Sequence, residues 1–174
     1  WGGDLVTFIE QGNLYRLFSK FDFFSGGLGD GPVLTAIKQL PVGMNTAYRY
    51  NRFYPDKPGN LAFAEGYSKL TGQEPTNWAW QNSLACQFIF EALKRTNGKT
   101  DGMALAELKG MNVKSPFAVE DGITMRDSDH TIIGYPVAWG RTVAKLPYVE
   151  DFSPVAWSEI TELEAQWKAG KGYV

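Results

Sequence analysis

The sequence predicts an α/β fold, an open and largely parallel sheet with helices on its faces. The first observation is the order of its elements: β-prone run, glycine-rich loop, amphipathic helix and second β-prone run, which is typical of such sheets. The second is the composition, 174 residues with 44% apolar and 21% charged side chains, as in ordinary folded domains. The third is a helix signal within the first five residues. A helix this early normally follows a strand, so we expect that the chain begins inside an α/β unit.

The charge balance and the scarcity of cysteine and histidine exclude several classes of protein. With 17 Lys+Arg against 19 Asp+Glu, the chain lacks the excess of basic residues that nucleic-acid binding requires. No stretch approaches the roughly 20 consecutive apolar residues of a membrane span. Cys86 and His130 are the single cysteine and histidine, which excludes an internal disulfide and a Cys/His zinc site, and we expect no metal or other cofactor.

The first third of the chain alternates helices and strands. Leu5, Phe8 and Ile9 fall at helical spacing, and proline at position 32 fits a first helical turn. In order, we expect a helix capped by Asp4, a β-prone run at 21–24, a glycine-rich loop at 25–32, a helix over 33–40 and a strand at 43–49.

The remainder is mostly helical, with β pieces late in the chain. Two prolines within 51–58 predict a connection, and Cys86 in mid-helix is expected to be a small buried side chain. We expect a helix at 60–70 closed by Gly72, a long helix at 77–96 that stops at Asn97-Gly98, and a short helix after a cap at Asp101. Short β segments should follow over 113–126, around a turn at Asp121-Gly122. A strand over 131–139, with Pro136 at an edge or bulge, and a final helix from Ser153-Pro154 to Lys168 complete the chain.

Two polar segments could carry chemistry. Gly27-Leu28-Gly29-Asp30-Gly31 lacks the Lys-Ser/Thr of a phosphate-binding P-loop, and Pro32 occupies the place of the last glycine of G-x-G-x-x-G. The loop could hold a polar ligand through free helix N–H groups, or simply form a tight turn. Asp127-Ser128-Asp129-His130 predicts a turn or hinge, because catalytic triads are assembled from positions distant in sequence. Nothing in the sequence favours an enzyme.

Aromatic residues form 14% of the chain, and two tryptophans stand at the start of one helix. Trp78 and Trp80 must face different directions, so a single core does not easily absorb both. One of them could form the wall of a small-molecule cleft, as could Trp1 at its strand-to-helix junction. Packing in a core or between domains is the alternative for each.

Three segments are distinctive when taken together: Trp1-Gly2-Gly3-Asp4-Leu5-Val6-x-Phe8, then Asn60-x-x-Phe63-x-x-x-Tyr67-x-x-x-x-Gly72-x-x-Pro75, and residues 115–130, ending in Arg126-x-x-Asp129-His130. Together they resemble type I periplasmic binding proteins, in the branched-chain amino acid-binding family of ABC transporters. The first segment is similar to a strand-to-helix junction of the second lobe, the second to a family helix with its exit, and the third to the stretch before the last crossover. The similarity extends to about residue 149.

The resemblance implies parts of two doubly wound, Rossmann-like lobes that close by hinge motion on a ligand in the cleft between them. Residues 1–50 would belong to lobe two, 51–130 to lobe one, and 131–174 to a return to lobe two followed by a C-terminal helix. The hinge residues would be Tyr50 and Tyr54 at one crossing and Asp129 and His130 at another. The leader peptide and most strands of lobe one would lie upstream.

The resemblance also implies where a ligand binds. Trp1 or Gly2 and Trp78 fall on aromatic walls of the cleft, and the loop with Gly27, Leu28 and Asp30 falls where amino-acid binders place an acid for the ligand's ammonium group. Gly27 occupies that position, so we expect a small organic acid with an aromatic or aliphatic body rather than an α-amino acid, unless Asp30 substitutes.

The function implied is that of a periplasmic solute-binding component, with an ABC permease in the membrane as its partner. A sensor of the same fold that controls a regulator is the first alternative, and an α/β enzyme acting on a small molecule is the second. Because incomplete lobes leave strand edges unpaired, we also expect a partner in the missing N-terminal half or in a dimer that exchanges elements.

Overall fold

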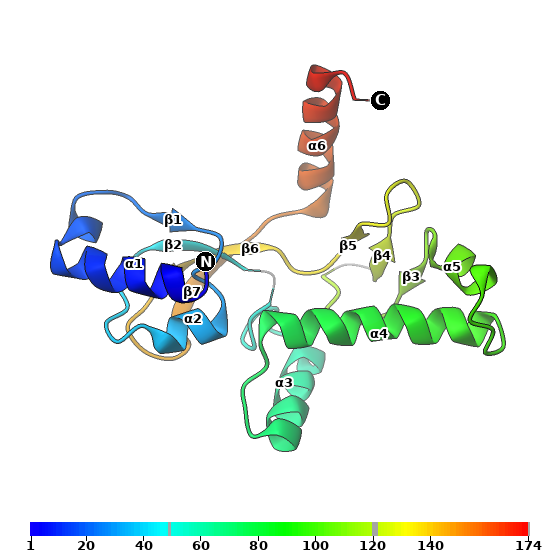
Figure 1. Ribbon diagram of the computed structural model, residues 1–174, viewed down its shortest axis with the longest axis horizontal. Helices are drawn as coiled ribbons and strands as arrows, with labels where there is room; N and C mark the ends of the chain where they lie inside the picture. The colour runs from blue at the N-terminus through cyan, green and yellow to red at the C-terminus, as the bar shows by residue number, and fades with distance from the viewer. Residues whose placement is uncertain (49, 120–121, 174) are drawn as a thin grey trace.

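The computed structural model describes residues 1–48, 50–119 and 122–173, which form two sheets flanked by helices (Figure 1). The helices are α1 (Gly3–Leu14), a 3₁₀ turn (Leu17–Ser19), α2 (Gly31–Ala36), α3 (Pro58–Thr71), α4 (Asn77–Arg95), α5 (Gly102–Leu108) and α6 (Trp157–Lys171). The strands are β1 (Phe24–Ser25), β2 (Asn45–Tyr48), β3 (Asn112–Val113), β4 (Ile123–Met125), β5 (Ile132–Ile133), β6 (Ala138–Thr142) and β7 (Val149–Pro154).

The first sheet has the strand order β1-β2-β6-β7 and carries α1 and α2. β1 and β2 are parallel, as the order of elements predicts, whereas β6 and β7 add antiparallel pairs. Alternate residues of β6 are buried, so one face of the strand contacts the core. The buried residues of this core are Ile9, Leu28, Val33, Leu34, Ile37, Met44, Tyr48 and Val149.

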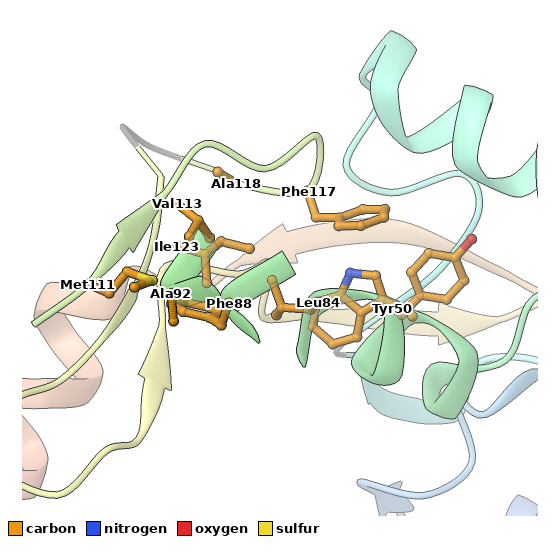
Figure 2. Packing of buried hydrophobic residues seen from close by; sticks show 10 residues of the cluster. Tyr50, Leu84, Phe88, Ala92, Met111, Val113, Phe117, Ala118 and Ile123 are labelled. Atoms are coloured by element: carbon orange, nitrogen blue, oxygen red, sulfur yellow. The ribbon is translucent and has the colours of Figure 1, made fainter. Parts of the chain in front are cut away.

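The second sheet is antiparallel in the order β3-β4-β5, and the long helix α4 runs beside it (Figure 1). Four residues at a spacing of four place one stripe of α4 in the core: Trp80, Leu84, Phe88 and Ala92. Figure 2 shows Leu84, Phe88 and Ala92 of this stripe together with core residues from the sheet and from the segment after β3. Thr76 caps the helix by accepting a hydrogen bond from the Ala79 N–H at 3.1 Å. The helix therefore begins at Asn77, as predicted.

The chain passes between the two sheets after β2 and again between β5 and β6. The first passage is fastened by Asn60, which is fully buried. Its amide nitrogen donates to three carbonyl oxygens of the passage: Asn51 at 2.9 Å, Arg52 at 3.2 Å and Pro55 at 3.1 Å. Because one side chain holds three backbone groups, residues 50–57 keep a defined course between the sheets.

The predicted strand over 131–139 is wrong as a single element. Residues 132–133 form β5 of the second sheet, and residues 138–142 form β6 of the first. Between them Gly134 has φ +91°, a backbone conformation that favours glycine, and Pro136 has no N–H for a ladder. This segment is the second passage between the sheets.

The predicted start of the last helix is also wrong. Ser153 and Pro154 end strand β7, and α6 begins at Trp157. Pro154 is tolerated because β7 is an edge strand with a neighbour on one side only, so the missing N–H does not remove a hydrogen bond to a second strand. The Trp157 indole donates to the carbonyl of Tyr135 at 2.6 Å and fixes the first turn of α6.

Smaller differences have local causes. Gly2, not Asp4, precedes the first helix, and Asp4 lies in its first turn, where a negative charge is favourable. α2 ends at Ala36 because Ile37 turns to an extended conformation and is buried in the first core. Cys86 is exposed, because it lies on the side of α4 opposite the buried stripe. Of the predicted turn at 121–122, Asp121 lies outside the described residues.

α6 projects from the rest of the chain (Figure 1). An ion pair between Arg126 and Glu164 connects the helix to the segment after β4. Arg126, which follows β4, contacts Glu164 of α6 at 2.6 Å and Asp129 at 2.6 Å. Lys168 also contacts Glu164, at 2.7 Å. Hydrogen bonds from Arg126 and then Lys168 lower the pKa of Glu164 from 4.5 to about 2.

The lowered pKa predicts that α6 loosens in acid. Because the pKa of Glu164 is depressed in the folded chain, its contribution to stability is present above about pH 4.5 and is lost as the pH falls toward about 2. The NMR signal of the Trp157 indole N–H, which reports the bond to Tyr135, should shift over this range. In Glu164→Gln the change in this signal should be smaller. Part of it should remain, because Asp129 also has a lowered pKa, mainly through the hydrogen bond from the Thr131 N–H. An identical titration in both proteins would contradict this prediction.

Candidate ligand-binding site

Two exposed tryptophans from different parts of the fold meet at one point. Trp1 precedes α1, which covers the first sheet, and Trp78 lies in the first turn of α4, which covers the second. Their rings are edge to face, with centroids 5.8 Å apart and an interplanar angle of 88°. Trp1 is 71% exposed and Trp78 48% exposed. Trp80 is 1% exposed, so the two tryptophans of α4 do face different directions, as the sequence predicts.

A cavity of about 180 Å³ lies beside this pair, and we call it the tryptophan cavity. Its walls are Trp1, Gly2, Asp30, Pro32, Val33, Thr76, Asn77 and Trp78. Four residues that the sequence suggests as ligand contacts therefore line one space: Trp1, Gly2, Asp30 and Trp78.

The other two loop residues have different positions. Gly27 lies behind Trp1, since a Cβ at this position would stand 3.3 Å from the Trp1 ring. Leu28 is fully buried in the first core and lines neither this cavity nor the larger one described below. Gly27 thus allows the Trp1 ring to lie close to the loop, and Leu28 fixes the loop to the core.

Asp30 is the residue before α2, and its carbonyl accepts hydrogen bonds from the N–H groups of Val33 and Leu34. These bonds start the helix and place Asp30 in the wall of the tryptophan cavity. The loop therefore brings an acidic residue to this space, although Gly27 has no side chain to do so.

Asn77 is a site residue that the sequence reasoning missed. It is 5% exposed, and within the described residues neither its amide oxygen nor its amide nitrogen has a hydrogen-bond partner. It stands beside the cap residue Thr76 at the N-terminus of α4, where backbone N–H groups also point outward. In the sequence, the visible sign of this role was an asparagine directly after Thr76, the residue that already caps the helix. Buried amide groups without partners are rare, which marks Asn77 as a candidate ligand contact.

A larger cavity, of about 320 Å³, lies next to the first passage between the sheets, and we call it the crossover cavity. Its walls are residues 50–53, 73–77 and 146–148 together with Gly29, Gly31, Pro32, Leu34 and Thr35. It shares Pro32, Thr76 and Asn77 with the tryptophan cavity. The two spaces are therefore neighbours at the N-terminus of α4.

The four predicted hinge residues fall in two different places. Tyr50 lines the crossover cavity, and Tyr54 stacks on Phe152 of β7 with centroids 4.9 Å apart, so both belong to the first passage. Asp129 and His130 lie in the turn between β4 and β5, where Asp129 pairs with Arg126. The second passage is formed instead by residues 134–137, between β5 and β6.

The wall of the crossover cavity contains an ion pair, Arg52 with Glu74, and a buried hydroxyl, that of Tyr50. The Nη1 of Arg52 contacts both carboxylate oxygens of Glu74 at 2.5 Å, which neutralises this ion pair. Burial raises the pKa of the Tyr50 hydroxyl well above its usual value, so the group stays protonated at neutral pH. A protonated phenol can donate a hydrogen bond to a ligand.

Two sheets flanked by helices define a protein of the α/β class, and sequence comparison specifies its family. Residues 1–138 match the sequence model of a family described as periplasmic binding protein, and the chain belongs to this family. The resemblance drawn from its motifs is thereby confirmed.

Solved structures of ABC transporter solute-binding proteins share the fold. One, from Rhodopseudomonas palustris BisB5 in complex with 3,4-dihydroxybenzoic acid, is 26% identical with a TM-score of 0.70, over 89% of this chain and 41% of that one. A leucine-, isoleucine-, valine-, threonine- and alanine-binding protein from Brucella ovis is 25% identical with a TM-score of 0.64, over 90% and 40%. A periplasmic binding protein from Burkholderia mallei, at 14% identity and TM-score 0.72 over 90% and 40%, shows the fold alone.

The chain spans about two fifths of the length of these structures. Among curated proteins, none matches the sequence significantly. In the described ranges, no helix has the length and apolar character needed to cross a membrane.

Proposed function

We propose that this chain is part of a solute-binding component of an ABC transporter and that the tryptophan cavity is where it holds its ligand. The observation that carries the proposal is the ring contact between Trp1, beside the first sheet, and Trp78, beside the second. The same cavity is lined by Asn77, whose amide has no hydrogen-bond partner within the described residues. Aromatic walls with a few polar groups are typical of small-molecule sites, and a site between two units can close on its ligand.

The chemistry of the walls favours a small aromatic carboxylate. The indoles offer flat apolar surfaces for a ring, and the Asn77 amide with the N-terminus of α4 offers donors for a carboxylate. Asp30 offers an acceptor for a hydroxyl or an ammonium group at the other end of the ligand. The Rhodopseudomonas palustris structure with 3,4-dihydroxybenzoic acid supports a hydroxylated aromatic acid, and the Brucella ovis protein keeps an amino acid as the second choice.

The same proposal assigns parts of the chain to lobes. Residues 1–50 form part of lobe two, residues 51–130 part of lobe one, and residues 131–174 return to lobe two and end in α6. Tyr50 and Tyr54 act at the hinge, with residues 134–137 as the second crossing, and Asp129 and His130 support the β4–β5 turn beside it. Closure presents the ligand-bound protein to a membrane permease, on the periplasmic side.

A further partner is needed for the outer side of α4. Cys86, Ile89 and Phe90 are exposed there, on the side opposite the core stripe. Since the chain spans about two fifths of its structural relatives, we assign this face to the remaining part of a complete binding protein, or to a second copy that exchanges elements.

The proposed site predicts that Trp78→Ala weakens the binding of 4-hydroxybenzoate about tenfold, because the loss of a ring contact costs about 1–2 kcal/mol. Isothermal titration calorimetry measures this without relying on tryptophan fluorescence. Trp167→Ala is the matched control, since this indole is exposed on α6 and stacks on Tyr173 rather than on the cavity. The native chain should bind 4-hydroxybenzoate more tightly than leucine. Tight leucine binding without a response to 4-hydroxybenzoate, or equal affinities in both tryptophan variants, would overturn the proposal.

A further inference from the structure

The crossover cavity contains hydrogen-bond donors that the folded chain leaves unused. Within the described residues, three buried donor atoms in its walls have no acceptor: the Tyr50 hydroxyl, the Arg52 Nε and the Asn77 amide nitrogen. Tyr50 is 8% exposed and Asn77 is 5% exposed, so neither side chain reaches bulk water freely. Buried donors without partners are rare in folded proteins, and three in one cavity indicate a missing acceptor.

The positions of these donors are fixed by packing. The Tyr50 ring stacks on Trp80 with centroids 6.1 Å apart and meets Phe63 and Phe117 edge to face. Figure 2 shows its hydroxyl at the end of the ring that points away from the other residues of this core. The Asn77 side chain is set by the capped first turn of α4. The donors are therefore held in place before a ligand arrives.

Arg52 defines the charge that a ligand can carry. Its Nη1 is committed to Glu74, but a guanidinium has five N–H donors, and the buried Nε remains without a partner. Because Glu74 already balances the charge of Arg52, the cavity suits a monoanion better than a dianion such as phosphate. A carboxylate has two oxygens that together can accept all three hydrogen bonds.

Part of the remaining wall is apolar. Leu34, Phe53 and Tyr148 line the same space, and the volume of about 320 Å³ is within the range of small-molecule sites. We propose that the crossover cavity is a second binding site, separate from the tryptophan cavity, which takes small monocarboxylates with a short apolar tail. Its carboxylate end contacts Tyr50, Arg52 and Asn77, and its tail contacts the apolar wall.

This site joins both parts of the fold. Its walls include α2 and the β6–β7 loop on one side, and residues 73–77 and the passage at 50–53 on the other. A bound carboxylate therefore contacts both parts at the point where the chain crosses between them. Asn77 lies in the walls of both cavities, so each site is tested with its own ligand and with a variant of a residue that only one cavity contains.

Butyrate titration followed by ¹H–¹⁵N NMR tests the site. The Arg52 Nε–H signal, assigned by its loss in Arg52→Lys, should shift with saturation, while the Trp78 indole N–H stays in place. Tyr50→Phe keeps the ring packed on Trp80 and removes the donor, so it should weaken butyrate binding about tenfold. Tyr67→Phe, on α3 outside the cavity, should leave the affinity unchanged. Butyramide, which has the same tail but one acceptor oxygen and no charge, should bind at least tenfold more weakly.

The outcomes separate this site from the proposed function. No saturable shift at Arg52, equal shifts with butyramide, or an unchanged affinity in Tyr50→Phe would each overturn the second site. Trp78→Ala should leave butyrate binding intact, and a parallel loss of butyrate and 4-hydroxybenzoate in that variant would show a single site. If butyrate binds and 4-hydroxybenzoate does not, the proposed function fails while the second site stands.

Discussion

Trp80→Ala should lower the free energy of unfolding by about 3–5 kcal/mol, whereas Trp78→Ala, two residues away on the same helix, should lower it by less than about 1 kcal/mol. Trp80 is 1% exposed and its ring contacts those of Tyr50, Phe117 and Tyr135. Removing it leaves a large cavity in the second core. Trp78 is half exposed and its ring contacts that of Trp1. Urea unfolding followed by circular dichroism gives both values.

Trp80→Phe separates volume from hydrogen bonding. The Trp80 indole nitrogen is buried without an acceptor in the described residues, so phenylalanine removes part of the volume but also an unsatisfied donor. We therefore expect a loss well below that of Trp80→Ala. Equal losses for alanine at positions 78 and 80 would contradict the assignment of Trp80 to the core and Trp78 to the cavity wall.

The same pair of tryptophans shows what sequence periodicity can predict and where it stops. A spacing of two on a helix fixes that Trp78 and Trp80 face different directions. It does not fix which one is buried, because this depends on where the second sheet and Tyr50 lie. The long helix from Asn77, its start beside Thr76 and the parallel β1–β2 pair were predictable, since each follows from local spacing and capping.

Residues 131–139 show the opposite case. Their β-prone side chains predict extended backbone, and most of the segment is extended or turned rather than helical. The division into β5 and β6 depends on two different sheets as partners, and no local pattern encodes the partner of a strand. Gly134 and Pro136 were the visible signs of a break. The start of α6 was missed for the same reason, because Ser153-Pro154 satisfies a helix-start rule but pairs with β6.

The candidate site was predicted through its aromatic and loop residues and missed at its buried polar ones. Trp1 and Trp78 stand out by type, Asp30 belongs to the glycine-rich loop, and Gly2 follows from the family resemblance. Asn77 and Arg52 become notable only when burial leaves their donors without partners. Burial is a property of the assembled fold, and a single sequence does not give it for polar residues.

Asn60→Leu should lower the free energy of unfolding by about 2–3 kcal/mol and loosen the first passage between the sheets. Leucine keeps the branched shape and the number of side-chain heavy atoms of asparagine but removes the amide that donates to the carbonyls of Asn51, Arg52 and Pro55. The Asn51 and Pro55 carbonyls keep a second partner in the N–H groups of Tyr54 and Lys57. The Arg52 carbonyl loses its hydrogen bond, and the cost is that of an unsatisfied buried acceptor together with two weakened ones.

Two measurements test this change. Urea unfolding gives the loss of stability, and hydrogen exchange should become faster at the Tyr54 and Lys57 amides than at amides of α4. Asn82→Leu is the matched control, because Asn82 is exposed and donates only to the carbonyl of Trp78 within its own helix. It should change stability by less than about 0.5 kcal/mol. Because residues 50–53 also form a wall of the crossover cavity, Asn60→Leu should weaken butyrate binding as well. Native stability with native exchange at Tyr54 would mean that the passage is held by something other than Asn60.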